Sequence, residues 1–173
     1  ISGNLKQDKG DIYFNSLNIN NLNINKRARL GISQSFQKNS LFLEMTVKES
    51  IMLALSHKYK ITFKMLNSLI NNKAINNDAI EIAKDTGLLD YFDTKSDNLS
   101  YGLQRQLELG IAISCNPKLL LLDEPTAGMS PAETKEIIKL IKKLSAKYSI
   151  IIVEHDMDVI YELANRIYVL DRG

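Results

Sequence analysis

The sequence has few of the residues that would place it outside ordinary globular proteins. Only one of its 173 residues is cysteine, which excludes an internal disulfide and fits a reducing compartment. Eight glycines and three prolines are too few for a collagen-like or wholly disordered chain. No aliphatic run is longer than Leu119–Leu122, far short of the roughly 18 residues of a membrane-spanning helix.

The charge and the apolar content narrow the class further. Lysine and arginine number 22 and aspartate and glutamate 20, so the formal net charge is only +2. Such a balanced surface does not favour a nucleic-acid binder held by bulk charge. Apolar residues make up 45% of the chain and charged residues 24%, which is typical of a protein that buries a core. At this length we expect one domain, or one domain with an inserted lobe.

The two ends of the sequence are unusual. Residues Ile1–Gly3 read like the end of a helix capped by glycine, without the basic and apolar stretches of a signal peptide. Residues Leu170–Gly173 read like a strand that runs into a turn. We therefore expect a fragment that is truncated at both ends, the alternative being a processed but complete chain.

The first half of the chain combines short strands with a block of helices. Residues 10–14 and 30–36 are expected to be strands, and the asparagine-rich residues 15–25 a loop. From Thr46 onward apolar residues recur at helical spacing, and Thr46 with Glu49 forms a capping-box pattern. Helical patterns continue to about Phe92 and include an amphipathic stretch over 61–73. We expect a block of short helices between two parts that contain strands.

The last third alternates helices and strands. Helices are expected over residues 103–115, from Ser130, and from Asp156 to Asn165. Cys115 is expected to be a small core residue on the first of these helices. Aliphatic strands are expected over 119–123, 149–153 and 167–170. This alternation predicts an α/β protein with a parallel sheet and right-handed crossovers.

Acidic residues follow two of these strands, at the edge where parallel sheets bind ligands. One strand ends in Asp123-Glu124 and the next in Glu154-His155-Asp156. An Asp in this place can hold Mg²⁺, and the Glu that follows it can polarise an attacking water, as nucleotide hydrolysis requires. The alternative is a strand that simply runs into an acidic turn.

A second candidate site lies at the start of the helix before this strand. Ser100 and Gly102 offer a hydroxyl and backbone N–H groups at the positive end of the helix dipole, a combination that binds phosphate. Taken alone, Ser100 is equally well explained as an N-cap residue. Its short separation from Asp123-Glu124, one helix and a turn, favours the phosphate site.

The motifs, in this order, resemble those of the nucleotide-binding subunit of ABC transporters. The stretches that carry the resemblance are Ser35–Gln37 with Leu41-Phe42 (Q-loop), Leu99–Gln106 (signature motif), Leu119–Pro125 (Walker B strand), Ala127–Pro131 (D-loop) and Glu154–Asp156 (switch histidine). The resemblance covers essentially the whole chain. Tyr101 and the stretches 127–134 and 153–157 most resemble importers of the branched-chain amino-acid and urea class.

The resemblance implies a P-loop NTPase-like parallel sheet with an inserted helical subdomain. Residues 1–36 would be a truncated N-terminal strand region of the catalytic core, and 37–98 the Q-loop and helical subdomain. Residues 99–173 would be the part of the core that carries the signature, Walker B, D-loop and switch-histidine motifs. The implied activity is ATP hydrolysis, in which Glu124 activates water and His155 donates a hydrogen bond to the γ-phosphate. Asp123 and Gln37 would bind Mg²⁺.

The resemblance also implies partners. Ser100, Gly102 and Gln104 would contact ATP held by a second ABC ATPase subunit, in a homodimer or heterodimer. Transmembrane permease subunits would dock over the helical lobe near residues 40–65 and link the chain indirectly to a substrate-binding protein, and no nucleic acid is implied. The chain would lie peripherally at the cytoplasmic face of the cell membrane.

The implied function is ATP-driven import of branched-chain amino acids or related small solutes. The alternatives are an ATPase of the lipopolysaccharide-export type, a non-transport regulatory protein with the ABC fold, and a non-functional gene remnant. A single cassette encoded beside permease genes would favour transport.

The sequence departs from the family pattern in three places. It has no Gly-x-x-x-x-Gly-Lys-Ser/Thr phosphate loop, which in the family directly precedes the helix expected to end at Ile1–Gly3. Ser130 stands where the D-loop usually has Asp. Tyr101 replaces a common Gly, which leaves Ser100 and Gly102 as the phosphate-facing pair. We therefore expect these 173 residues alone neither to bind ATP tightly nor to hydrolyse it.

Overall fold

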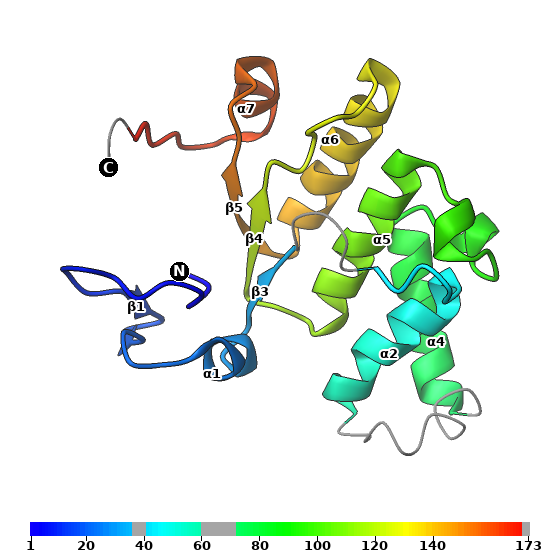
Figure 1. Ribbon diagram of the computed structural model, residues 1–173, viewed down its shortest axis with the longest axis horizontal. Coiled ribbons are helices and arrows are strands. Elements are labelled where there is room, and N and C mark those ends of the chain that lie inside the picture. Colours follow the sequence, from blue (N-terminus) through cyan, green and yellow to red (C-terminus); the bar gives the residue numbers. More distant parts are fainter. Residues whose placement is uncertain (36–40, 60–71, 171–173) are drawn as a thin grey trace.

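A parallel three-stranded sheet lies at the centre of the fold (Figure 1). The computed structural model describes residues 1–35, 41–59 and 72–170. The strands are β3 (Ile32–Gln34), β4 (Leu119–Asp123) and β5 (Ser149–Val153), in the order β3-β4-β5. Asp123 pairs with Val153, so β4 and β5 end at the same edge. The predicted α/β class with a parallel sheet is confirmed.

Two helices cover one face of this sheet, α5 (Tyr101–Ser114) and α6 (Pro131–Ser145) (Figure 1). Leu120 and Leu122 of β4 are buried in a cluster with apolar residues of both helices. Each such buried Leu contributes about 1.5–3 kcal/mol by removal from water. Ile151 and Val153 of β5 alternate with the residues on that face and are 42% and 59% exposed. Within the described residues, the second face of β5 is therefore open to solvent.

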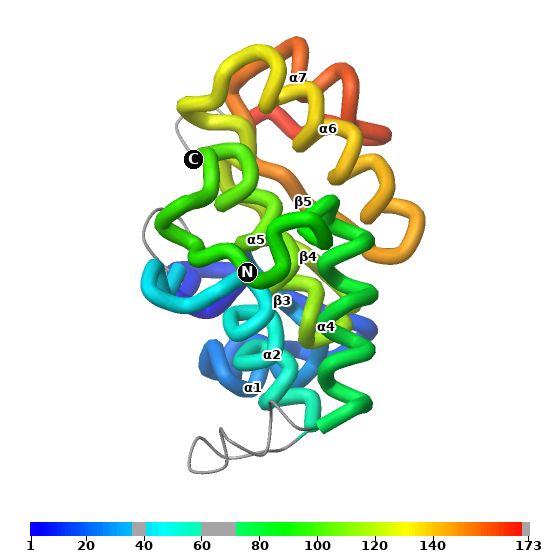
Figure 2. Tube along the Cα trace, turned by 90° about the vertical axis from the view of Figure 1, so that its right-hand side faces the viewer, coloured from blue at the N-terminus to red at the C-terminus, as the bar shows by residue number. Residues whose placement is uncertain are grey.

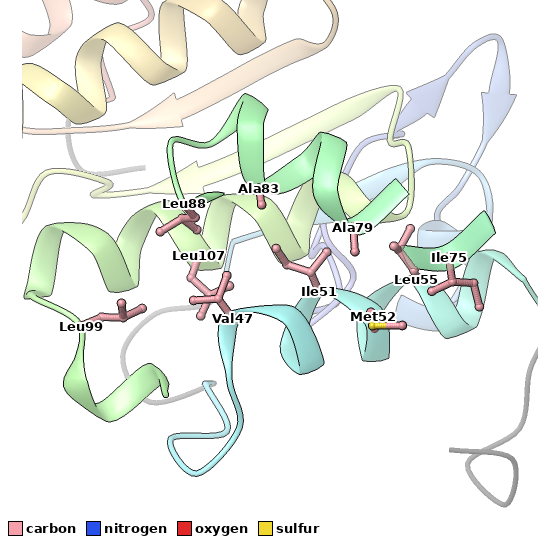
Figure 3. Packing of buried hydrophobic residues seen from close by; sticks show 10 residues of the cluster. All are labelled: Val47, Ile51, Met52, Leu55, Ile75, Ala79, Ala83, Leu88, Leu99 and Leu107. Carbon is pink, nitrogen blue, oxygen red and sulfur yellow. The ribbon is translucent and has the colours of Figure 1, made fainter. Parts of the chain in front are cut away.

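A second apolar core lies among α2 (Val47–Lys58), α4 (Lys73–Asp85) and α5, and Figure 3 shows its side chains pointing toward one another. Thr46 starts α2 with the predicted capping box, in which its side chain accepts a hydrogen bond from the Glu49 N–H. Two 3₁₀ turns, η2 (Leu89–Tyr91) and η3 (Ser96–Asn98), connect α4 to α5. Figure 2 shows α2 and the start of α4 at the end of the molecule away from α6. Residues 61–71 of the expected amphipathic stretch lie outside the described residues.

The N-terminal part differs from the expected loop over residues 15–25. It forms a small antiparallel pair, β1 (Tyr13–Phe14) and β2 (Leu17–Asn18), followed by the helix α1 (Ile24–Arg29). Asparagine disfavours the interior of a helix but is a good N-cap residue. Asn23 caps the start of α1, where its side chain accepts a hydrogen bond from the Lys26 N–H. Arg27 then anchors the helix by donating to the carbonyl oxygens of Leu22 and Ile1, at 2.8 and 2.7 Å.

Two further expectations are wrong. The helix after β5 is α7 (Met157–Leu163), but residues 167–170 form no strand, and Val169 and Leu170 are 87% exposed. An aliphatic run becomes a strand only beside a hydrogen-bonding neighbour, and the described residues provide none there. Cys115 is exposed rather than in the core, because it caps the end of α5 outside the buried face. In the part of the chain that the structure describes, no helix is both long and apolar enough to span a membrane.

Candidate functional site

The carboxyl edge of the sheet brings together the acids predicted at the ends of β4 and β5. The backbone N–H of Glu124 donates to the carbonyl oxygen of Val153 at 2.8 Å, which extends the ladder beyond Asp123. His155, the second residue after β5, then lies with Nδ1 3.3 Å from Oε1 of Glu124. Both side chains reach solvent, the carboxylate 43% and the imidazole 76% exposed. A water or phosphate oxygen at this edge can therefore contact both groups.

Asp123 is the last residue of β4 and is half-buried beside this pair. It lies on the same face of the sheet as its partner Val153, the face that α5 and α6 do not cover. Among the described residues no group of three or more His, Cys, Asp or Glu side chains forms a cage for a metal. Mg²⁺ bound with nucleotides takes one or two carboxylates and completes its shell with phosphate oxygens and water. A single carboxylate at this edge fits that requirement.

The predicted phosphate site at the start of α5 is built differently from the expectation. Ser100 is exposed and caps the helix, with Oγ accepting from the Leu103 N–H at 3.4 Å. The N–H of Gly102 is already paired, because it donates to Oε1 of Glu133 at 3.0 Å. Oε2 of Glu133 accepts from both the hydroxyl and the N–H of Ser130. The hydrogen bonds from Ser130, and then that from Gly102, hold the pKa of Glu133 below its usual value.

Gln104 is turned into the protein. Its Nε2 donates to the carbonyl oxygens of Ser96 and Leu99, at 3.0 and 3.3 Å, and the residue is half-buried. In this arrangement the amide ties α5 to the preceding 3₁₀ turn. The hydroxyl of Tyr101 instead faces the loop after β4 and donates to the carbonyl oxygen of Ala127 at 3.1 Å. The start of α5 is thus joined to residues 127–133 by Tyr101 and Gly102.

Gln37 lies outside the described residues. Ser35, two residues before it, lies beside β4, because its N–H donates a hydrogen bond to the carbonyl oxygen of Leu121 at 2.9 Å. The role of Gln37 stays a prediction. Among the acids that the sequence places after β5, Asp156 caps α7 by accepting hydrogen bonds from the N–H groups of Asp158 and Val159.

The sequence does not predict the contacts of three residues that organise this edge, namely Glu133, Thr126 and Glu154. Glu133 had one visible indication, its place three residues after Ser130 in a capping box, but its reach to Gly102 depends on how α5 and α6 pack. Glu154 was expected at the ligand edge, yet its side chain is only 2% exposed. Its Oε1 accepts from the Thr126 hydroxyl at 2.5 Å. No periodicity in the sequence predicts that pair, which joins two separate loops.

Comparisons with known proteins agree on the family. The family model described as ABC transporter matches residues 1–127. The high-affinity branched-chain amino acid transport ATP-binding protein LivG of Escherichia coli K12 is 33% identical over 180 aligned positions, covering 100% of this chain and 71% of that protein.

Solved structures give the same result. An ATP-binding cassette of an ABC transporter is 31% identical, with a TM-score of 0.77, covering 92% of this chain and 65% of the other. A second cassette, solved as a dimer bound to ADP and Pi in a post-hydrolysis state, is 26% identical with a TM-score of 0.74, covering 92% of this chain and 68% of the other. The chain thus spans about two thirds of the length of its solved relatives. It belongs to the ABC transporter family of ATP-binding proteins.

Proposed function

We propose that this chain is part of the ATP-hydrolysing subunit of an ABC importer for branched-chain amino acids or related small solutes. The observation that carries the proposal is the contact between His155 and Glu124, next to Asp123, at the carboxyl edge of a parallel sheet. An imidazole and a carboxylate that both reach solvent from rigid strand ends suit a reaction between water and a phosphate. The identity to LivG supports the solute class.

In this proposal each residue at the edge has one task. Glu124 accepts a proton from the attacking water, and His155 donates a hydrogen bond to the γ-phosphate. Asp123 and Gln37 hold Mg²⁺, which neutralises charge on the phosphate oxygens when it is bound. The aliphatic strand behind Asp123 keeps these groups in place. The phosphate-binding loop of the family is not in the 173-residue sequence, so binding of ATP by this chain's own site depends on a segment outside it.

The proposal places a second ATPase subunit against the start of α5. Ser100 is exposed there, and Gly102 lies directly behind it at the same helix terminus. The dimeric cassette solved with ADP and Pi supports a two-subunit arrangement. In it, Ser100 and Gly102 would bind the γ-phosphate of ATP held by the partner, which requires that Glu133 release the Gly102 N–H.

A groove of about 840 Å³ offers a place for the permease. It runs between α1 and β3 on one side and α2 and α5 on the other. Its wall includes Phe42, Leu53, Ala54 and His57, which fall within the residues 40–65 expected to face the permease. We propose that a segment of the permease docks there and holds the chain peripherally at the cytoplasmic face of the membrane. Residues 37–98 then act as the helical subdomain.

Measurements on two forms of the protein test this function. The extended form is defined as this chain with the family's phosphate-binding loop, its strand and its helix added before Ile1. The extended form should bind Mg·ATP at micromolar concentration and release phosphate. The 173-residue chain alone should neither bind Mg·ATP at micromolar concentration nor release phosphate, because that loop supplies most of the hydrogen bonds to the phosphates. Micromolar binding by the chain alone, or an inert extended form, would contradict the proposal.

The solute class needs a separate test. The extended form should restore uptake of labelled leucine to Escherichia coli cells that lack LivG, when any permease subunits found encoded beside its gene are expressed with it. A form carrying Glu124→Gln is the matched control and should not restore uptake. If the extended form hydrolyses ATP in vitro but restores no uptake of branched-chain amino acids, the proposed ATPase activity is retained and the proposed solute class is rejected.

A further inference from the structure

Glu154 is a buried carboxylic acid between two exposed residues. Its side chain is 2% exposed, whereas Val153 before it is 59% exposed and the imidazole of His155 after it 76%. Burying a carboxylate is costly unless hydrogen bonds replace its water shell. The structure supplies these bonds from both sides, so the inward orientation of Glu154 is held by specific partners.

Both oxygens of Glu154 accept hydrogen bonds. Oε1 accepts from the hydroxyl of Thr126 at 2.5 Å and from its backbone N–H at 3.2 Å. Oε2 accepts from the backbone N–H of His155 at 3.1 Å. Thr126 is itself only 8% exposed. Glu154 therefore ties the turn after β4 to the start of the loop after β5.

The turn that Glu154 holds carries Glu124. The backbone of Glu124 has a φ of 44°, in the left-handed region that residues with a side chain seldom adopt. Its carbonyl oxygen accepts from the Ala127 N–H at 3.1 Å, which closes the turn around Thr126. A turn in such a conformation persists only where surrounding contacts determine it. The two bonds from Thr126 to Glu154 are contacts of that kind.

We propose that Glu154 is a positioning residue, which fixes His155 at hydrogen-bonding distance from Glu124 by clamping Thr126 and the His155 N–H to one carboxylate. The inference rests on the proposed function, in which His155 and Glu124 act on the γ-phosphate and water. The three groups that bind Glu154 are all donors, so a carboxylate, which only accepts, satisfies them all. A glutamine would face one of them with its own NH₂ group.

The first test is amide hydrogen exchange in the extended form without nucleotide. Glu154→Gln should speed exchange at least tenfold at the Thr126 or the His155 amide, since the amide side chain accepts at one oxygen only. Glu162→Gln removes an exposed carboxylate from α7 and is the matched control, which should change both rates less than twofold. Unchanged exchange at both amides in Glu154→Gln would overturn the proposal, whether or not the protein hydrolyses ATP.

The second test separates positioning from a general loss of structure. Glu154→Gln and Thr126→Val should each lower kcat of the extended form at least tenfold and leave KM for ATP within threefold. Thr126→Ser keeps the hydroxyl and should stay within threefold of the parent. In a His155→Ala background, Glu154→Gln should lower kcat less than twofold further, because the residue acts through His155. An equal loss of kcat in the His155 and the His155→Ala backgrounds would overturn the proposal. If the unsubstituted extended form is itself inactive, the proposed function is rejected, and the hydrogen-exchange test alone decides whether Glu154 is a positioning residue.

Discussion

The backbone N–H of Gly102, in the first turn of α5, donates a hydrogen bond to the carboxylate of Glu133, in the first turn of α6, the next helix along the chain. A side chain at position 102 has no room, because a Cβ there would lie 2.9 Å from Cγ of Glu133. The glycine at position 102 is therefore needed for packing within the subunit, in addition to the contact with phosphate that we propose for it.

Gly102→Ala should push Glu133 aside and break this hydrogen bond. We expect a loss on the order of 1 kcal/mol in the free energy of unfolding, the value of one such bond, measured by urea denaturation. Gly110→Ala in the same helix is the control, since the nearest atom to its Cβ is 3.4 Å away, an ordinary contact. It should leave stability unchanged or raise it by up to about 1 kcal/mol, because alanine favours helices. In a Glu133→Ala background, Gly102→Ala should cost much less, and an equal cost would contradict the account.

Ser100→Arg should block ATP-dependent dimerisation of the extended form while leaving its affinity for ATP within threefold. The arginine places bulk and positive charge at the positive end of α5, where the proposed partner's phosphate enters. It also removes the N-cap, at a cost of about 1 kcal/mol. Ser100→Asn retains a capping side chain and should still dimerise. Sedimentation velocity with Mg·ATP checks this, and normal dimers of the Arg variant would count against the assignment of Ser100.

Asp85 links α4 to α6 by ion pairs, and these pairs predict how the stability of the fold depends on pH. Its carboxylate oxygens lie 2.7 Å from Nζ of Lys147 and 3.1 Å from Nζ of Lys143. These partners, Lys147 foremost, hold the pKa of Asp85 below its ordinary value. The stabilisation is therefore present above that ordinary pKa and is lost as the pH falls through the lowered pKa of the folded state.

Asp85→Asn should accordingly lower the free energy of unfolding by about 0.5–1 kcal/mol at pH 7, a value typical of a partly exposed ion pair. The difference from the parent should shrink as the pH falls below the ordinary pKa of Asp, and should vanish once Asp85 is protonated in the folded state as well. Thermal unfolding at a series of pH values measures it. A difference that persists at the acid end would show that the carboxylate acts by packing instead of by charge.

The elements that the sequence predicted well are those whose cause is local. The run Leu119–Asp123 has enough aliphatic residues to form a buried strand wherever a neighbour exists. Ser130 and Glu133 specify a helix start by bonds within four residues, and the structure has both bonds. The acids at the ends of β4 and β5 followed from this alternation, because parallel strands share a carboxyl edge.

The elements that the sequence did not predict depend on distant partners. Helix α1 forms among asparagines because Arg27 is anchored on the carbonyl oxygen of Ile1. Residues 167–170 are aliphatic but have no strand beside them in the described residues, so they stay exposed. The bond between Thr126 and Glu154 joins residues 28 positions apart. Such contacts arise from packing, which composition and spacing do not encode directly.

In the proposed function, Glu124 activates water at an edge completed by the family's phosphate-binding loop. The direct measurement is phosphate release from Mg·ATP by the extended form with Glu124→Gln, beside an ATP titration of the same protein. The amide keeps the shape of the side chain and loses the base, so release should fall by a factor on the order of 10²–10⁴ while the dissociation constant for ATP stays within threefold. Steady phosphate release within tenfold of the parent rate would contradict the account.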